Sequence, residues 1–141
     1  MTDDTRARAR ALSTPMTARQ FHLGDIISAA FGVLVSLRHI DGVYDTLNFL
    51  TGDNLFTHQL PRAGRAVQPY VLEQHPQLVP LLTSTKRVTT KNWRKWLKQQ
   101  IALYGEFLPL EPLPPGAWTH VDALQELETM VPKDRIIVVK T

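Results

Sequence analysis

Residues 22–62 read HLGDIISAAFGVLVSLRHIDGVYDTLNFLTGDNLFTHQLPR, and this stretch carries two helical patterns, of which the second is the clearest in the chain. The first apolar stripe ends at Gly32, a typical helix stop, and consists of Leu23, Ile26, Ile27, Ala30 and Phe31. The second follows a predicted N-cap at Ser36 and consists of Ile40, Val43, Tyr44, Leu47 and Leu50. The stretch therefore predicts two amphipathic helices joined by a short apolar link.

Helical spacing continues beyond residue 60 and predicts four further helices. Proline inside a helix removes a backbone hydrogen bond, so Pro69 predicts a kink or a break in the first of them. The helix at 91–104 has the strongest pattern, and the hydroxyl of Thr90 is its predicted N-cap. In the last predicted helix, Leu124 and Leu127 face inward. The predicted ranges are 61–74, 75–82, 91–104 and from Thr119 or Asp122 to residue 131, with a polar loop at 83–90.

The clearest strand pattern lies near the C-terminal end of the sequence. Residues 136–139 form a continuous β-branched run, which is typical of a buried strand near 135–140. A strand needs a partner, and the candidates are 107–110, 20–23 and 33–35. We therefore expect a mostly helical α+β fold, with about five or six helices and a small C-terminal β element whose favoured pair is 107–110 with 135–140.

The chain of 141 residues predicts one domain and one arm. Residues 1–19 contain few large apolar side chains, which predicts a flexible N-terminal arm. Residues 20–141 then form a single helical-rich domain. We expect a cytoplasmic protein, because no apolar run reaches the roughly 18–20 residues of a membrane helix and the first residues lack a secretory signal pattern.

Composition and motifs argue against several kinds of chemistry. The chain has no cysteine, which removes thiolate catalysis and thiolate metal sites. It also lacks a phosphate-binding glycine loop, a GxSxG elbow and an HExxH pair, so we expect no cofactor and no metal. The best candidate for catalysis is the group of histidines and aspartates between residues 39 and 58, although a solvent-facing acidic row needs no function.

The net charge of +3 conceals a strongly basic middle segment. Residues 61–104 hold eight basic residues and one acidic residue, while residues 21–60 and 105–141 are each acidic. A local basic patch attracts phosphates or an acidic protein surface. The candidate residues for nucleic-acid or acidic-surface binding are Lys86, Arg87, Lys91, Arg94, Lys95 and Lys98.

The stretch at 22–62 resembles a family of uncharacterised phage and prophage proteins with the pattern LGDILS…TG.LVS..HI.GVYDILN.MTGD.LFTHQLPR. PYVLEQHPQL at 69–78, YGE at 104–106 and the run IIVV at 136–139 are also similar to that family. This chain departs from the pattern at 29–31, where AAF replaces a more polar stretch, and at Leu37, where a proline is frequent. The resemblance implies a phage accessory role, such as that of anti-CRISPR proteins.

Three functional hypotheses follow. The first is a phage-encoded, non-catalytic inhibitor that occludes a bacterial defence complex in the host cytoplasm. The second is a sequence-tolerant DNA- or RNA-binding protein that uses the basic segment 86–98. The third is an enzyme built on the histidine and aspartate group. For the first hypothesis, the partner-binding candidates are Asp41, Tyr44, Asp45, Asp53, His58 and Arg62.

Overall fold

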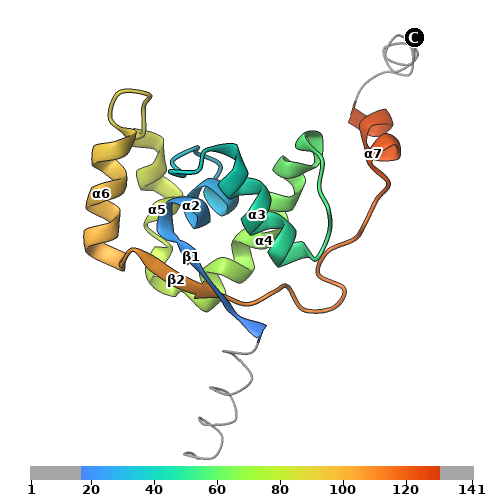
Figure 1. The fold of residues 1–141 in the computed structure, drawn as a ribbon, viewed down its shortest axis with the longest axis horizontal. Coiled ribbons are helices and arrows are strands. Elements are labelled where there is room, and N and C mark those ends of the chain that lie inside the picture. The colour runs from blue at the N-terminus through green and yellow to red at the C-terminus, as the bar shows by residue number, and fades with distance from the viewer. Residues whose placement is uncertain (1–16, 131–141) are drawn as a thin grey trace, which may run out of the picture.

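The computed structural model describes residues 17–130, which form a helical body with one small sheet (Figure 1). This architecture confirms the predicted mostly helical α+β class. The α-helices of the described residues are α2 (Leu23–Phe31), α3 (Ile40–Thr51), α4 (Leu60–Gln74), α5 (Leu81–Ser84), α6 (Trp93–Tyr104) and α7 (Ala123–Met130). Three 3-10 turns join them, namely η1 (Thr57–Gln59), η2 (Pro76–Leu78) and η3 (Thr85–Arg87).

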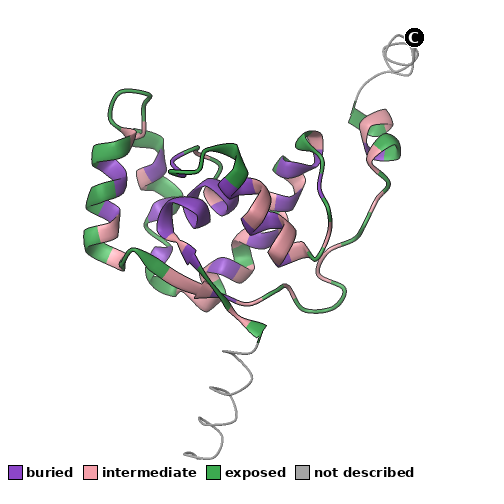
Figure 2. Cartoon of the chain, in the orientation of Figure 1, coloured by how far each residue is buried: buried purple, intermediate pink, exposed green. Residues whose placement is uncertain are grey.

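Helix α2 is the centre of the core. Eight of its nine residues are buried, and it packs against α3, α4, α5 and α6. Figure 2 shows it as an almost unbroken buried segment enclosed by half-exposed helices. The helix ends at Gly32 with a left-handed φ of 78°, as the sequence predicts. The largest fully buried side chains are Phe21, Leu23, Ile26, Ile27, Leu47, Leu50, Leu78, Leu81, Leu110, Val35, Val67 and Val71.

The sheet contains one of the predicted strands. Strand β2 (Phe107–Leu110) is present, and within the described residues it pairs with the antiparallel strand β1 (Arg19–His22). Both strands contribute to the hydrophobic core, because Phe21 of β1 and Leu110 of β2 are buried there. Arg19, placed in the predicted arm, is already paired with Leu110. The predicted strand at 135–140, like most of the arm, lies outside the described residues.

The start of α3 also differs from expectation. Ser36 is not its N-cap, because its hydroxyl donates to Asp25 Oδ1 while accepting from the backbone N–H of Arg38. The helix instead begins after His39, whose positive φ of 58° is rare for a residue other than glycine. The hydroxyl of Ser36, which the local sequence predicts as a helix cap, instead donates a hydrogen bond to the buried carboxylate of Asp25 in α2.

Helix α4 continues from Leu60 to Gln74 through Pro69, so of the two predicted outcomes, a kink or a break, the break is wrong. Val67 and Val71 are buried on either side of the proline. The side chain of Gln68 also donates to the carbonyl of Ala30 in α2. These contacts hold the helix together at the position where one backbone hydrogen bond is missing.

Three smaller predictions are corrected. The expected polar loop at 83–90 contains η3, and α6 follows Asn92 rather than Thr90. In α7, Leu124 is exposed although the sequence predicts that it faces inward, Leu127 is half-buried, and Glu126 is buried. The burial of Glu126 has an electrostatic cause, because its carboxylate meets the partly exposed Arg62 and the buried Gln59.

Candidate functional site

A charge network joins β1, α2 and α3. The carboxylate of Asp25 is 3% exposed and accepts hydrogen bonds from Ser36 and from two nitrogens of Arg38, at 2.6 and 3.2 Å. Arg38 also donates to Asp45 at 2.9 Å. Arg19 donates to both oxygens of Asp45 from the other side. Asp45, a predicted partner-binding residue, is therefore already engaged inside the protein.

The charges in this network reinforce one another. The hydrogen bonds that Arg38 donates to Asp25 and to Asp45 raise the pKa of Arg38 above its ordinary value, despite partial burial. The hydrogen bond from Arg19 lowers the pKa of Asp45, and the bond from Arg38 adds to that effect against the opposing effect of burial. Arg38 and Asp45 therefore stay ionised at neutral pH, and their hydrogen bonds hold three elements together.

A second polar cluster binds the C-terminal strap, which we define as residues 111–130, to the turn before α4. The guanidinium of Arg62 donates to both oxygens of Glu126 at 2.8 Å and lies 4.0 Å from the ring centre of Trp118. Gln59, which is buried, donates to the same carboxylate at 3.1 Å. The strap thus reaches the body through a bidentate ion pair, a geometry that arginine favours with carboxylates.

The strap has further contacts around this pair. Asp53 Oδ2 accepts hydrogen bonds from the indole of Trp118 at 2.9 Å and the ring of His120 at 2.8 Å. His58 Nε2 donates to the carbonyl of Ala123 at 2.8 Å, at the start of α7. Figure 1 shows the strap running past the end of α3 to α7 at the far side of the body. Three predicted partner-binding residues, Asp53, His58 and Arg62, therefore bind the chain's own C-terminal part.

Electrostatics favour the bound strap at neutral pH. The hydrogen bond from Arg62 lowers the pKa of Glu126, and this effect outweighs the rise that burial causes. Burial raises the pKa of Asp53, but hydrogen bonds from Trp118 and His120 outweigh it and leave the pKa lowered. A carboxyl group whose pKa is lowered by folding stabilises the folded protein at pH values above its ordinary pKa. That contribution is lost as the pH falls through the lower pKa of the folded state.

We expect Arg62→Ala to release the strap while the helical body stays folded. The change leaves Glu126 without its cation in a buried position, which costs about 2–3 kcal/mol locally, less than a fully buried pair because Arg62 is partly exposed. Amide hydrogen exchange should accelerate across residues 117–130 and stay unchanged in α2. Acidification of the unmodified protein should have the same local effect.

The matched control is Arg65→Ala, one turn further along α4, because Arg65 is exposed and forms no ion pair within the described residues. This variant should keep the exchange pattern of the unmodified chain. Unchanged protection of residues 117–130 in Arg62→Ala would show that the ion pair does not hold the strap.

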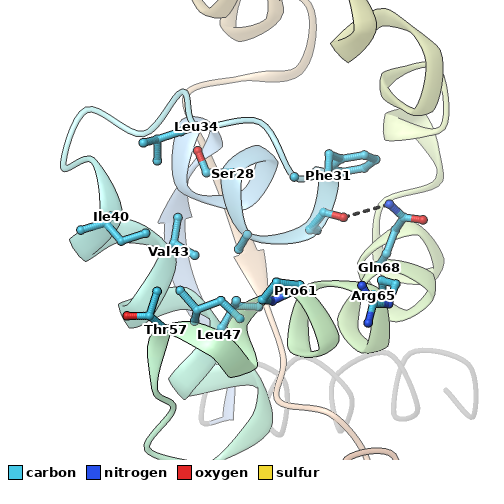
Figure 3. A pocket seen from close by; sticks show the side chains of 15 residues that line it. Ser28, Phe31, Leu34, Ile40, Val43, Leu47, Thr57, Pro61, Arg65 and Gln68 are labelled. Atoms are coloured by element: carbon cyan, nitrogen blue, oxygen red, sulfur yellow. Dashed lines mark hydrogen bonds between the residues drawn. The ribbon is translucent and has the colours of Figure 1, made fainter. Parts of the chain in front are cut away.

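An apolar groove lies between α2, α3 and α4. Its volume is about 520 Å³. Figure 3 shows Val43 and Leu47 of α3 facing Pro61 of α4, with Leu34 and Ile40 at the rim. Leu34 and Ile40 are both exposed, which is unusual for large aliphatic side chains in such proximity. Asp41 and Tyr44 also belong to α3, and the hydroxyls of Tyr44 and Thr57 are hydrogen-bonded to each other.

A basic face covers η3, the following turn and the outer side of α6. It consists of six exposed residues, Lys86, Arg87, Lys91, Arg94, Lys95 and Lys98. Trp96 and Leu97 are buried on the opposite side and anchor α6 to the core. Arg94 lies over the ring of Trp93 at 4.9 Å. Across residues 17–130, no carboxylate lies within ion-pair distance of any of the six.

The histidine and aspartate group between residues 39 and 58 is not brought together as one site. Asp45 pairs with arginines, Asp53 with Trp118 and His120, and His58 with a backbone carbonyl. His39 is exposed, and among the described residues no group of three or more histidines and carboxylates has the arrangement of a metal site. Asp45, Asp53 and His58 thus have separate structural partners, and the group does not converge in one cleft.

Sequence patterns missed four residues that organise these surfaces. Asp25 and Arg38 carry the charge network, and Trp118 and Glu126 hold the strap. Glu126 lies on the expected outward side of an amphipathic helix, so its position in the sequence gives little warning of burial. The clearest available signal was Asp25, a carboxylate inside the strongest apolar stretch, where burial demands a partner.

Comparison with known proteins gives a partial match. Residues 21–81 match the family model described as a domain of unknown function (DUF7736). The match includes the core helices α2, α3 and α4 but neither α6 nor the strap. No curated protein and no solved structure matched the chain. Within residues 17–130, no helix has the length and apolar character needed to span a bilayer.

Proposed function

We propose that this protein is a non-catalytic nucleic-acid-binding protein that uses its basic face. The observation that carries the proposal is the concentration of six exposed cations that have no ion-pair partner in the described residues. Cations that bind a phosphate backbone must be available and close together. The basic face meets both requirements.

The contrast with the other arginines supports this assignment. Arg19, Arg38 and Arg62 are all held by carboxylates, so they contribute to folding and present little free charge. The acidic residues that could neutralise cations are concentrated on α3, the strap and their surroundings. Residues 83–105 contain no acidic residue at all. The positive potential is therefore localised on one side of the molecule.

The rigidity of α6 adds to the argument. Its inner side contributes Trp96 and Leu97 to the core, and its end is fixed at Gly105 with a φ of 99°. Arg94, Lys95 and Lys98 consequently project from a helix that does not need to fold on binding. Prior ordering of the backbone lowers the entropic cost of association.

We expect the triple variant Arg94→Ala, Lys95→Ala, Lys98→Ala to lose most nucleic-acid affinity for all sequences alike. If each side chain contacts one phosphate, the slope of log affinity against log salt falls by about 2–3. Fluorescence anisotropy with labelled oligonucleotides, measured between about 50 and 200 mM salt, gives both quantities.

Arg65→Ala is again the control, because it removes an exposed cation from α4. It should change neither the affinity nor the salt slope by more than a small fraction. Absence of binding by the unmodified chain, or binding that salt does not weaken, would contradict the proposed function.

The apolar groove favours a second candidate function. We propose that a phage-encoded form of this protein occludes a bacterial defence complex in the host cytoplasm, as its resemblance implies. The exposed Leu34 and Ile40, with Asp41 and Tyr44 beside them, offer a surface suited to a protein partner. Asp45, Asp53, His58 and Arg62 take no direct part in this version, since they are engaged within the chain.

Phage infection assays test this second candidate. Expression of the protein should protect a sensitive phage from the defence system, and Leu34→Asp should abolish protection while leaving oligonucleotide binding intact. Full protection by Leu34→Asp would exclude the groove as the docking surface. Lack of protection by the unmodified protein against a panel of defence systems would discard the candidate.

A further inference from the structure

A polar pocket opens at the inner edge of the basic face, between η3 and α6. Its volume is about 350 Å³. Arg87 and Lys95 of the basic face contribute to its wall. The pocket also includes Ser84, Asn92, Trp96 and Gln100. Positive charge and uncharged polar groups are therefore combined in one hollow.

Three side chains of this pocket have polar groups without a partner. Gln100 is 7% exposed and Trp96 is 6% exposed, yet neither side chain forms a hydrogen bond within residues 17–130. The hydroxyl of Ser84 is buried and also has no partner there. Of the three, only the Ser84 hydroxyl is fully enclosed, so the amide of Gln100 and the indole N–H of Trp96 keep solvent access although their side chains are mostly buried. A ligand in the hollow could therefore bond these two groups without displacing a partner from within residues 17–130.

Asn92 has a different role in the same wall. Its Oδ1 accepts from the backbone N–H of Thr89 at 2.7 Å, and its Nδ2 donates to the carbonyl of Arg87 at 2.9 Å. Both ends of the amide are therefore engaged by the turn between η3 and α6. This arrangement fixes the backbone that carries Arg87 at the mouth of the pocket.

The chemistry of the pocket matches a nucleotide. Arg87 and Lys95 are suited to a phosphate group. The amide of Gln100 offers one donor side and one acceptor side, which is the pattern that reads the edge of a nucleobase. The indole N–H of Trp96 is a further donor. A simple anion would use the cations and leave the amide's acceptor unsatisfied.

We propose that this pocket takes one unpaired nucleotide of a single-stranded nucleic acid, an inference that rests on the proposed function. In a duplex the Watson–Crick edges are already paired and stacked, so a base enters such a pocket only from a single strand or after extrusion. The basic face binds the backbone on either side, and the pocket selects strands with accessible bases.

The test compares a labelled single-stranded oligonucleotide of mixed sequence with the matched duplex, each as DNA and as RNA. The unmodified chain should bind the single strand about tenfold more tightly than the duplex. Gln100→Leu keeps the size of the side chain and removes its amide, so single-strand affinity should fall about tenfold while duplex affinity stays the same. Thermal unfolding confirms that the variant is folded, and Gln100→Glu provides a second variant that adds repulsion between the pocket and phosphate.

Lys91→Gln separates this inference from the proposed function. Lys91 belongs to the basic face but not to the pocket, so its loss should weaken single-strand and duplex binding equally. Equal affinities for strand and duplex, or no effect of either Gln100 variant, would overturn the pocket assignment while salt-dependent binding still supports the proposed function. Absence of binding to every probe would overturn both.

Discussion

Replacement of Gly42 by alanine is expected to destabilise the protein by about 2–3 kcal/mol, although alanine is the better helix former. A Cβ atom at this position would lie within 3.0 Å of both Ser36 Oγ and Asp25 Oδ1. These two atoms are hydrogen-bonded to each other in the buried charge network. To make room for the Cβ atom, Ser36 Oγ and Asp25 Oδ1 would have to move away from α3, which would break their hydrogen bond or expose the carboxylate.

Urea unfolding monitored by circular dichroism measures the effect. Asp41→Ala is the matched control, since Asp41 precedes Gly42 on α3, is exposed and forms no side-chain hydrogen bond or ion pair within the described residues. The control should change the unfolding free energy by no more than about 0.5 kcal/mol. A stability of Gly42→Ala equal to or above that of the unmodified chain would show that α2 and α3 are not packed this closely.

The second large effect is expected for Arg38→Ala, which should cost about 3 kcal/mol. The variant leaves the carboxylate of Asp25, 3% exposed, without its cation and also removes one of the two arginines on Asp45. Removal of one partner from a buried ion pair typically costs about 3–5 kcal/mol, mainly because the other charge stays buried. The lower end applies because the side chain of Arg38 is 47% exposed.

A double-mutant cycle with Asp25→Asn separates charge burial from the loss of packing. The double variant should recover more than about 1 kcal/mol relative to Arg38→Ala, because no uncompensated charge remains beside Ser36. Additive losses in the cycle would mean that Asp25 and Arg38 stabilise the fold independently. Arg65→Ala serves as the control for removing an arginine from the surface.

Local patterns in the sequence predicted the main helices correctly. Helices α2, α3 and α6 follow apolar stripes with a period near 3.6, and each ends at a glycine with positive φ. The reason is that helical hydrogen bonds and capping involve residues only a few positions apart. The exposed cations of the basic face were found for the same reason, since the six lie close together along the chain.

Pairings between distant residues could not be read in this way. The fragment 107–110 was a correct strand, but four residues carry no information on which of several short apolar segments completes the sheet. Ser36 looks like a cap from its neighbours, yet Asp25, eleven positions earlier, binds its hydroxyl. The burial of Glu126 likewise could not be predicted from its neighbours in sequence, because it depends on Arg62 and Gln59, more than sixty residues away.

By itself, the sequence determined the helical class, most helix ends and the basic character of one segment. Only the tertiary structure decided that Asp53, His58 and Arg62 hold the C-terminal strap, and that Trp96 and Gln100 share a pocket with Arg87 and Lys95. The physical reason is that periodicity and capping are local, whereas ion pairs and pockets depend on the way helices pack. Whether a charged residue is available at the surface or forms an ion pair within the protein depends on which residues the fold places beside it.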